Sequence, residues 1–121
     1  MILGIRTAIY PVSDLALATS WYGAVFGCAP YFEQPFYVGF NVGGFELGLV
    51  PDGVACSQGS TVYWGVDDIG AEVARITALG ASVHAPIKDV GQAIQVADLL
   101  DPFGNVLGLI QNPHFDPAAV R

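Results

Sequence analysis

Basic residues and metal-binding side chains are scarce in this chain. Four lysines and arginines stand against eleven aspartates and glutamates, which gives a formal net charge of −7 over 121 residues. An acidic surface of this kind repels phosphate backbones, so we expect no nucleic-acid partner. Two histidines and two cysteines are present, but they form no Cys-x-x-Cys pair and no cluster with zinc spacing. The sequence therefore lacks the usual signature of a metal centre.

Long hydrophobic segments are also missing. No apolar run approaches the roughly 20 residues that span a membrane, and the start of the chain lacks the apolar core of a secretion signal. We therefore expect no membrane partner, and we interpret Cys28 and Cys56 as reduced thiols of a cytoplasmic protein. The chain is nevertheless 53% apolar, which is enough for one well-buried domain over residues 1–121.

The first half of the chain predicts a strand, a helix and three further short strands. Ser13 or Asp14 can cap the helix, because its side-chain oxygen can accept from free backbone N–H groups. Gly27 is expected to end the helix, as glycine often does. The strands are expected at 4–12, 29–32, 36–41 and 45–50.

The same order of elements then starts again. Residues 12–15 (VSDL) are matched by 66–69 (VDDI), and residues 47–50 (LGLV) are matched by 107–110 (LGLI). A second helix is expected from Asp68 to Gly80. Further strands are expected at 60–66, 82–84, 93–99 and 105–111, with a loop at 85–91 and a turn at 101–104.

This internal repeat determines the domain organisation. Module one covers about 1–53, module two covers about 58–115, and the polar stretch 51–59 lies at the boundary. Neither module could bury its sheet alone, so the two must share a core. We therefore predict an α+β fold of two tandem βαβββ modules within one domain.

Several short motifs carry a resemblance to a known family. They are YPVSDL at 10–15, WY at 21–22, FG at 26–27, VDD at 66–68, LGA at 79–81 and DPFGN at 101–105. With these motifs the chain resembles the vicinal oxygen chelate superfamily, which is also called the glyoxalase/bleomycin resistance protein/dioxygenase type. The resemblance implies that the two modules form a shared half-open barrel around a pocket, and that the protein is a homodimer.

Members of this family that use a metal hold it with a His in the first strand and a Glu in the last strand of each module. The resemblance places these four positions on Thr7, Gly48, Thr61 and Gly108. A hydroxyl is a poor ligand for a divalent ion and glycine has no side chain, so these residues fit no metal. We expect no metal or other cofactor, which argues against glyoxalase I, extradiol dioxygenase and fosfomycin-modifying chemistry. The four positions are expected to line a ligand pocket instead.

Glu46 is the candidate polar group of this pocket. It stands two residues before Gly48, so strand alternation places both residues on one face. Inside an apolar barrel, desolvation would favour the protonated carboxyl and would suit it for general acid/base work. Tyr63 is a candidate hydrogen-bond donor to Glu46. The alternatives are a solvated carboxylate at the rim of the barrel, or a carboxylate paired with Arg6.

Aromatic side chains are expected to form the pocket walls. Phe36, Tyr37 and Tyr63 are the candidates, because aromatic walls with a few polar groups suit a flat or apolar small molecule. Gly48 and Gly108 would widen the pocket, or else they mark a β-bulge or close packing where the two modules meet.

Three functions follow from these residues. The first is a metal-free module that binds a small molecule of cationic or aromatic character, because the surface is acidic and the expected walls are aromatic. The second is a metal-independent lyase or isomerase that uses Glu46 as its base. The third is a metal-dependent glyoxalase-like lyase or dioxygenase in which Glu46 belongs to the ligand set. Whether the protein is an enzyme is left open by the sequence.

Overall fold

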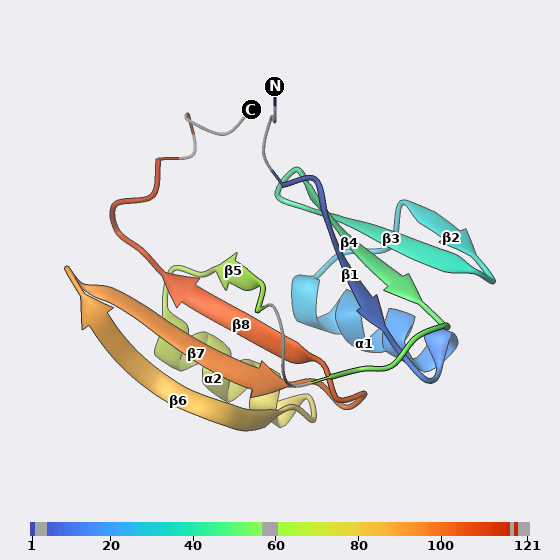
Figure 1. Ribbon diagram of the computed structural model, residues 1–121. Coiled ribbons are helices and arrows are strands. Elements are labelled where there is room, and N and C mark those ends of the chain that lie inside the picture. Colours follow the sequence, from blue (N-terminus) through green and yellow to red (C-terminus); the bar gives the residue numbers. More distant parts are fainter. Residues whose placement is uncertain (2–4, 57–60, 117, 119–121) are drawn as a thin grey trace.

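Two modules with the same order of elements follow each other along the chain. The computed structural model describes residues 1, 5–56, 61–116 and 118. Module one contains β1 (Thr7–Pro11), α1 (Leu15–Phe26), β2 (Phe32–Gln34), β3 (Tyr37–Val42) and β4 (Phe45–Val50). Module two contains β5 (Tyr63–Gly65), α2 (Ile69–Ala78), β6 (Ser82–Gly91), β7 (Ile94–Leu100) and β8 (Val106–Gln111). The two halves lie side by side, each with its helix against one face of its own sheet (Figure 1).

Each module forms its own four-stranded mixed sheet. The strand orders are β1-β4-β3-β2 and β5-β8-β7-β6. β1 runs parallel to β4 and β5 runs parallel to β8, whereas the other pairs are antiparallel. The register places Gly48 and Gly108 at equivalent points of the two sheets. The α+β fold of two βαβββ modules is therefore confirmed.

Both helices begin at the capping residues that the sequence predicts, and α1 ends at its predicted glycine, whereas α2 ends at Ala78, before the predicted Gly80. Asp14 accepts a hydrogen bond from the backbone N–H of Leu17 at 3.0 Å, and Asp68 accepts one from that of Ala71 at 3.1 Å. These bonds satisfy N–H groups that have no partner within the first helical turn. Gly27 follows α1 in the left-handed conformation, with φ of 69°. Among the described helices, none is long and apolar enough to cross a membrane.

Hydrogen bonds from buried side chains connect the two modules. The Tyr22 hydroxyl of α1 donates to Asp101 Oδ2 at 2.5 Å, and Asn105 Nδ2 donates to the Pro11 carbonyl at 2.8 Å. Asp101 also accepts from the backbone N–H groups of Phe103 and Asn105 in the turn before β8. We call Pro11, Tyr22, Asp101 and Asn105 the inter-module joint.

A single apolar cluster surrounds this joint and contains residues of both modules. Its fully buried side chains include Tyr22, Phe40, Leu47, Leu49, Leu99 and Leu107. The expectation that the two modules share a core is therefore correct, although no strand of one sheet is hydrogen-bonded to the other sheet among the described residues.

Two expected elements differ from those in the structure. The second strand was expected at 29–32, but β2 occupies Phe32–Gln34, because its pairing with β3 starts at the tight turn where Gln34 lies opposite Tyr37. The stretch 85–91 was expected to be a loop, but it belongs to β6, which pairs with β7 through irregular register. β6 is an exposed edge strand that contains Pro86, so its sequence lacks the alternation of a half-buried strand.

Candidate functional site

The face of the first sheet that points away from α1 carries Glu46. Leu47 and Leu49 are fully buried in the core between this sheet and α1. Because side chains alternate along a strand, Glu46 and Gly48 lie on the opposite face of β4. We call the face of each sheet that points away from its helix the inner face. The placement of Glu46 agrees with the alternation expected from the sequence.

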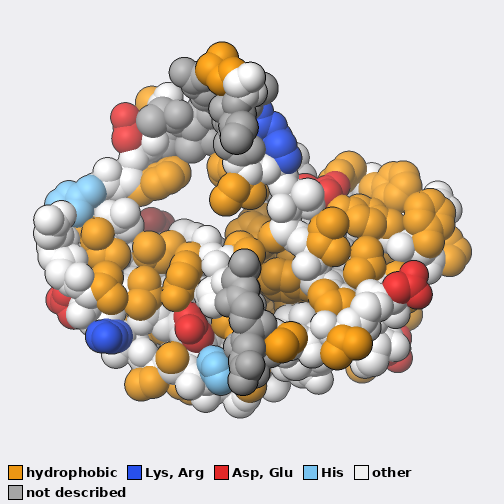
Figure 2. Space-filling view, viewed as in Figure 1, with side chains coloured by type: hydrophobic (Ala, Val, Ile, Leu, Met, Phe, Trp, Pro, Cys, Tyr) orange, Lys and Arg blue, Asp and Glu red, His pale blue; other side chains and the backbone are white. Residues whose placement is uncertain are grey.

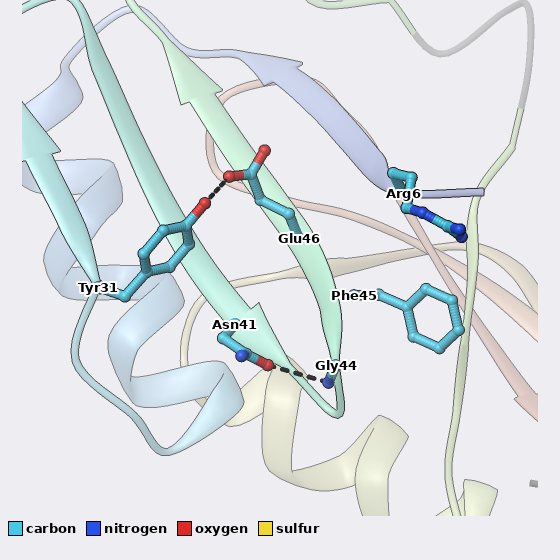
Figure 3. A pocket seen from close by; sticks show the side chains of 6 residues that line it. All are labelled: Arg6, Tyr31, Asn41, Gly44, Phe45 and Glu46. Carbon is cyan, nitrogen blue, oxygen red and sulfur yellow. Dashed lines mark hydrogen bonds between the residues drawn. The ribbon is translucent and has the colours of Figure 1, made fainter. Parts of the chain in front are cut away.

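Three hydroxyl groups converge on the Glu46 carboxylate. Thr7 Oγ1 donates to Glu46 Oε1 at 2.7 Å, and the Tyr37 hydroxyl donates to the same oxygen at 2.5 Å. The Tyr31 hydroxyl donates to Oε2 (Figure 3). Thr7 is in reach because the parallel register of β1 and β4 places it beside Glu46. Two of the three donors, Thr7 and Tyr37, were candidates from the sequence, and Tyr31 was missed.

Glycines allow the two tyrosine rings to lie across the sheet. A Cβ atom on Gly48 would stand 2.2 Å from the Tyr37 hydroxyl oxygen, and one on Gly39 would stand 3.1 Å from Tyr31 Cε1. Gly39 and Gly48 face each other in the register of β3 and β4. Gly48 therefore does not widen the pocket, because the Tyr37 phenol occupies the space that its missing side chain leaves. This packing lies within module one and not at the contact between the modules, which the sequence gave as an alternative.

The hydroxyl donors hold Glu46 in its ionised form. Hydrogen bonds from Tyr31 and Tyr37 lower the pKa of Glu46, and they outweigh the partial desolvation that would raise it. The same contacts raise the pKa of Tyr31, and burial followed by the bond to Glu46 raises the pKa of Tyr37. The expectation that desolvation would favour a protonated Glu46 is therefore wrong, because the local donors stabilise the charge more strongly.

Arg6 does not neutralise Glu46. Its guanidinium points away from the carboxylate and donates to the Ile5 carbonyl at 3.5 Å (Figure 3). Within the described ranges the ion pair found joins Glu72 and Arg75 on α2. A small pocket of about 120 Å³ lies at this end of the sheet, and its lining includes Arg6, Tyr31, Asn41, Gly44, Phe45 and Glu46. The negative charge of Glu46 is thus held by neutral hydroxyls and stays uncompensated.

The second sheet places the remaining candidates at the equivalent position. Tyr63 on β5 lies beside Gly108 in the parallel register, and a Cβ atom on Gly108 would stand 2.8 Å from Tyr63 Cδ1 and 3.1 Å from Thr61 Cγ2. The sequence suggested that Tyr63 donates to Glu46. In the structure, the carboxylate next to Tyr63 is instead that of Asp98 on β7. Burial, then the charge of Asp98, raises the pKa of Tyr63. The sequence analysis missed Asp98, although it stands between the buried Ala97 and Leu99 and must therefore face inward.

The other aromatic residues separate into an exposed group and a buried group. Phe36 is 65% exposed in the turn between β2 and β3, where it contacts Phe32 at a ring separation of 6.4 Å. Phe32 in turn contacts Tyr37 at 6.2 Å. Phe36 therefore lies at the rim, Tyr37 contacts Glu46, and Phe32 contacts both aromatic rings. Trp64 packs against Phe26 of α1 at 5.0 Å, on the side away from the inner face.

A wider groove lies on the other side of the first sheet. It has a volume of about 380 Å³ and is lined by Leu15, Ala16, Thr19, Glu33, Gln34, Pro35 and Val38. None of the candidate residues from the sequence contributes to it.

The four positions at which related metalloproteins carry ligands do not fit a metal here. Thr7 donates its hydroxyl to Glu46, Thr61 presents a methyl group toward Gly108, and the other two positions are glycines. In the part of the chain that the structure describes, no three His, Cys, Asp or Glu side chains are grouped so that they could hold an ion. Glu46 itself is occupied by three hydroxyl donors.

Comparison with known proteins identifies the family. A model of the Glyoxalase/Bleomycin resistance protein/Dioxygenase superfamily matches residues 4–109, and the chain belongs to this superfamily. No curated protein matches the chain significantly.

Several solved structures share the fold at low sequence identity. A glyoxalase-related enzyme from Fulvimarina pelagi has 19% identity and a TM-score of 0.75, with 93% of this chain and 90% of that chain covered. The fosfomycin resistance protein FosX from Listeria monocytogenes has 16% identity and a TM-score of 0.79, with 94% and 97% covered. TioX from Micromonospora sp. ML1 has 22% identity and a TM-score of 0.70, with 89% and 98% covered. At these identities the likeness shows the fold alone.

Proposed function

We propose that the protein binds a small organic cation on the inner face of its first sheet, without a metal, and that Glu46 is the anchor. The observation that supports this proposal is an ionised carboxylate that three neutral hydroxyls hold in place. An ionised carboxylate offers about four acceptor positions, and Thr7, Tyr31 and Tyr37 fill three of them. The remaining position and the uncompensated charge suit the N–H group of a cationic ligand.

The surroundings of Glu46 favour a ligand that also carries an aromatic or flat apolar part. Tyr31, which donates to the carboxylate, is 63% exposed, and Phe32, which contacts the Tyr37 ring, is 40% exposed, so both rings present open surface on this face. Aromatic faces attract cations as well as flat apolar groups. The net charge of −7 would further attract a cation toward the protein.

A role as catalytic base is less well supported. The hydroxyl donors that lower the pKa of Glu46 make its carboxylate a weaker base than an ordinary glutamate. A metal-dependent reaction is disfavoured by the chemistry of Thr7, Gly48, Thr61 and Gly108. FosX is a fosfomycin resistance protein, but its sequence is only 16% identical to this chain, so the same activity cannot be inferred from the shared fold.

Benzylamine, an aromatic ammonium, is a suitable probe, and the neutral benzyl alcohol is its matched control. We expect amide resonances of β4 to shift on titration with benzylamine and to stay unchanged with benzyl alcohol. Glu46→Gln should abolish these shifts, whereas Glu33→Gln on β2, whose side chain lines the outer groove, should leave them intact. Equal binding by the wild type and Glu46→Gln, or binding that requires added zinc, would contradict the proposal.

We also propose that the protein forms a homodimer through exposed apolar side chains of its two sheets that are not part of the Glu46 site. The inner face of the second sheet carries apolar side chains that are only half-buried, and Ile9 on the first sheet is 53% exposed. These half-buried side chains are Ile94, Val96, Leu100, Val106 and Ile110. Figure 2 shows hydrophobic side chains spread over both sheets on this side. Open apolar surface of this kind is typical of an interface.

Light scattering tests the dimer directly. We expect a mass of twice 12.7 kDa for the wild type. Ile9→Asp should shift the protein toward the monomer, and Leu17→Asp, at an equally exposed position on α1, should not. A wild-type monomer at micromolar concentration would overturn this part of the proposal.

A further inference from the structure

A second carboxylate, Asp98, lies on the inner face of the second sheet. Its neighbours in β7, Ala97 and Leu99, are buried in the core on the side of α2. Asp98 therefore points in the opposite direction, away from the helix. Its partner across the sheet is Gly108, and Gly108 lies beside Tyr63. The three residues form a row across the middle of the sheet.

Tyr63 lies over the glycine of this row and reaches the carboxylate. Its ring occupies the space where a side chain on Gly108 would stand, because a Cβ atom there would lie 2.8 Å from Tyr63 Cδ1. Its hydroxyl is close enough to Asp98 for the charge and the hydrogen-bond acceptance of that group to act on its pKa. Tyr63 is still 42% exposed, so one face of its ring is open.

The Asp98 carboxylate is incompletely satisfied. Its Oδ1 atom is shielded from solvent and has no hydrogen-bond partner among the described residues. Buried polar atoms almost always have a partner, so such an atom calls for an explanation. Lys88 is on the same face, two residues along the register from Asp98, yet the described residues contain no ion pair between them. Tyr63 interacts with the carboxylate, but the Oδ1 atom itself is left without a partner among the described residues.

We propose that Asp98 and Tyr63 form a second subsite, which binds a positively charged N–H group of a small organic ligand such as an ammonium or amidinium. The N–H group would donate to the Asp98 carboxylate, and the open face of the Tyr63 ring would attract its charge. The choice of ligand class rests on the function proposed for Glu46. The subsite itself is on the other sheet and uses none of the same side chains, so the two can fail separately.

Amide resonances tested with benzylamine distinguish the two subsites. We expect benzylamine to shift resonances of β7 and β8, including Gly108, and Asp98→Asn to weaken this binding at least tenfold. The matched control is Asp89→Asn on β6, which is exposed in the same sheet and should bind as the wild type does. Glu46→Gln should remove the shifts in β4 and leave those in β7 and β8. Unchanged binding in Asp98→Asn would overturn the second subsite while the function proposed for Glu46 stands.

Thermal unfolding without ligand separates binding from a structural role. If Asp98 serves to bind a ligand, its unpartnered charge is unfavourable in the free protein. Asp98→Asn removes this charge, so the variant should melt at the wild-type temperature or above it. Tyr63→Phe provides a second variant and should weaken benzylamine binding at β7 and β8 less than Asp98→Asn does. A melting temperature several degrees lower for Asp98→Asn, with benzylamine affinity unchanged, would show that the carboxylate is structural and would overturn the inference.

Discussion

The two modules carry similar backbones but different polar groups on their inner faces. In module one, Tyr37 lies over Gly48 and its hydroxyl joins two others around Glu46. In module two, Tyr63 lies over Gly108 beside Asp98, whose Oδ1 has no partner among the described residues. The tyrosines come from different strands, β3 in one case and β5 in the other. Both modules therefore have a glycine at the equivalent position, where a tyrosine ring packs. The tyrosine and the carboxylate come from different positions in the two modules.

Adding a methyl group to each of the two glycines should give the largest difference between the modules. In Gly108→Ala the new Cβ would stand 2.5 Å from the Val62 carbonyl oxygen, which is backbone and cannot move aside. We expect a loss of about 2–3 kcal/mol in the free energy of unfolding, as for overpacked cores. In Gly48→Ala the Cβ meets the end of the Tyr37 side chain, which can rotate outward, so we expect about 1 kcal/mol. Urea unfolding of both variants provides the measurement.

Equal losses in the two glycine variants would contradict this comparison. They would mean that Tyr37 is held as firmly as the backbone of Val62, and that module one has no more freedom at its inner face than module two.

Removing the two tyrosine hydroxyls should change the titration of Glu46. In the double variant Tyr31→Phe/Tyr37→Phe the pKa of Glu46 should rise, because the two strongest donors to its ionised form are lost. A folded-state pKa below the unfolded value stabilises the protein above the unfolded pKa, and this stabilisation disappears as the pH falls through the folded pKa. The wild type should therefore lose more stability than the double variant between about pH 5 and pH 3. NMR titration of the Glu46 side chain and urea unfolding at several pH values test both statements.

An unchanged pKa of Glu46 in the double variant would show that the hydroxyls do not hold the charge. Asn41→Ala is the matched control, because Asn41 lies beside Glu46 in the register but its side-chain oxygen accepts a hydrogen bond from the Gly44 N–H.

A smaller effect is expected at the hairpin tips, where the modules also differ. The turn between β3 and β4 has Gly43 and Gly44 at positive φ, whereas the turn between β6 and β7 has Gln92 and Ala93 at φ of 57° and 63°. Residues with a Cβ are strained in this left-handed region. We expect Ala93→Gly to stabilise the protein by about 0.5 kcal/mol, measured as a small rise in the melting temperature. Gly44→Ala should have the opposite sign, and a destabilised Ala93→Gly variant would show that the turn is not strained.

The sequence predicts the fold well because two signals agree along its length. The capping aspartates Asp14 and Asp68 begin both helices where expected, and the alternation in β4 and β8 places Leu47 and Leu107 in the core. β6 is the exception, because an exposed edge strand with a proline has no face to bury and so leaves no periodic pattern.

The polar contacts of the site are less predictable from the sequence. Alternation places Glu46 on the inner face, but its donors depend on rings that cross neighbouring strands, and Tyr31 precedes β2 without belonging to a strand. The pKa of Glu46 depends on the balance of those donors against desolvation, which cannot be obtained from strand parity. Asp98 could have been found, since a charged residue between two buried apolar ones must face the other way.

The inter-module joint has a mechanical consequence for the inner faces. Tyr22, Asp101, Asn105 and Pro11 fasten the end of β1 to the turn that begins β8, from the rear of the molecule. Because these hydrogen bonds join the modules at one place, a rotation of one module about them would move the far ends of both sheets the most. We therefore expect the separation of Glu46 and Asp98 to depend on residues of the joint, which take no part in either proposed site. If the proposed sites bind a ligand, substitutions in the joint should change the size of the molecule that fits, although the side chains of both sites stay the same.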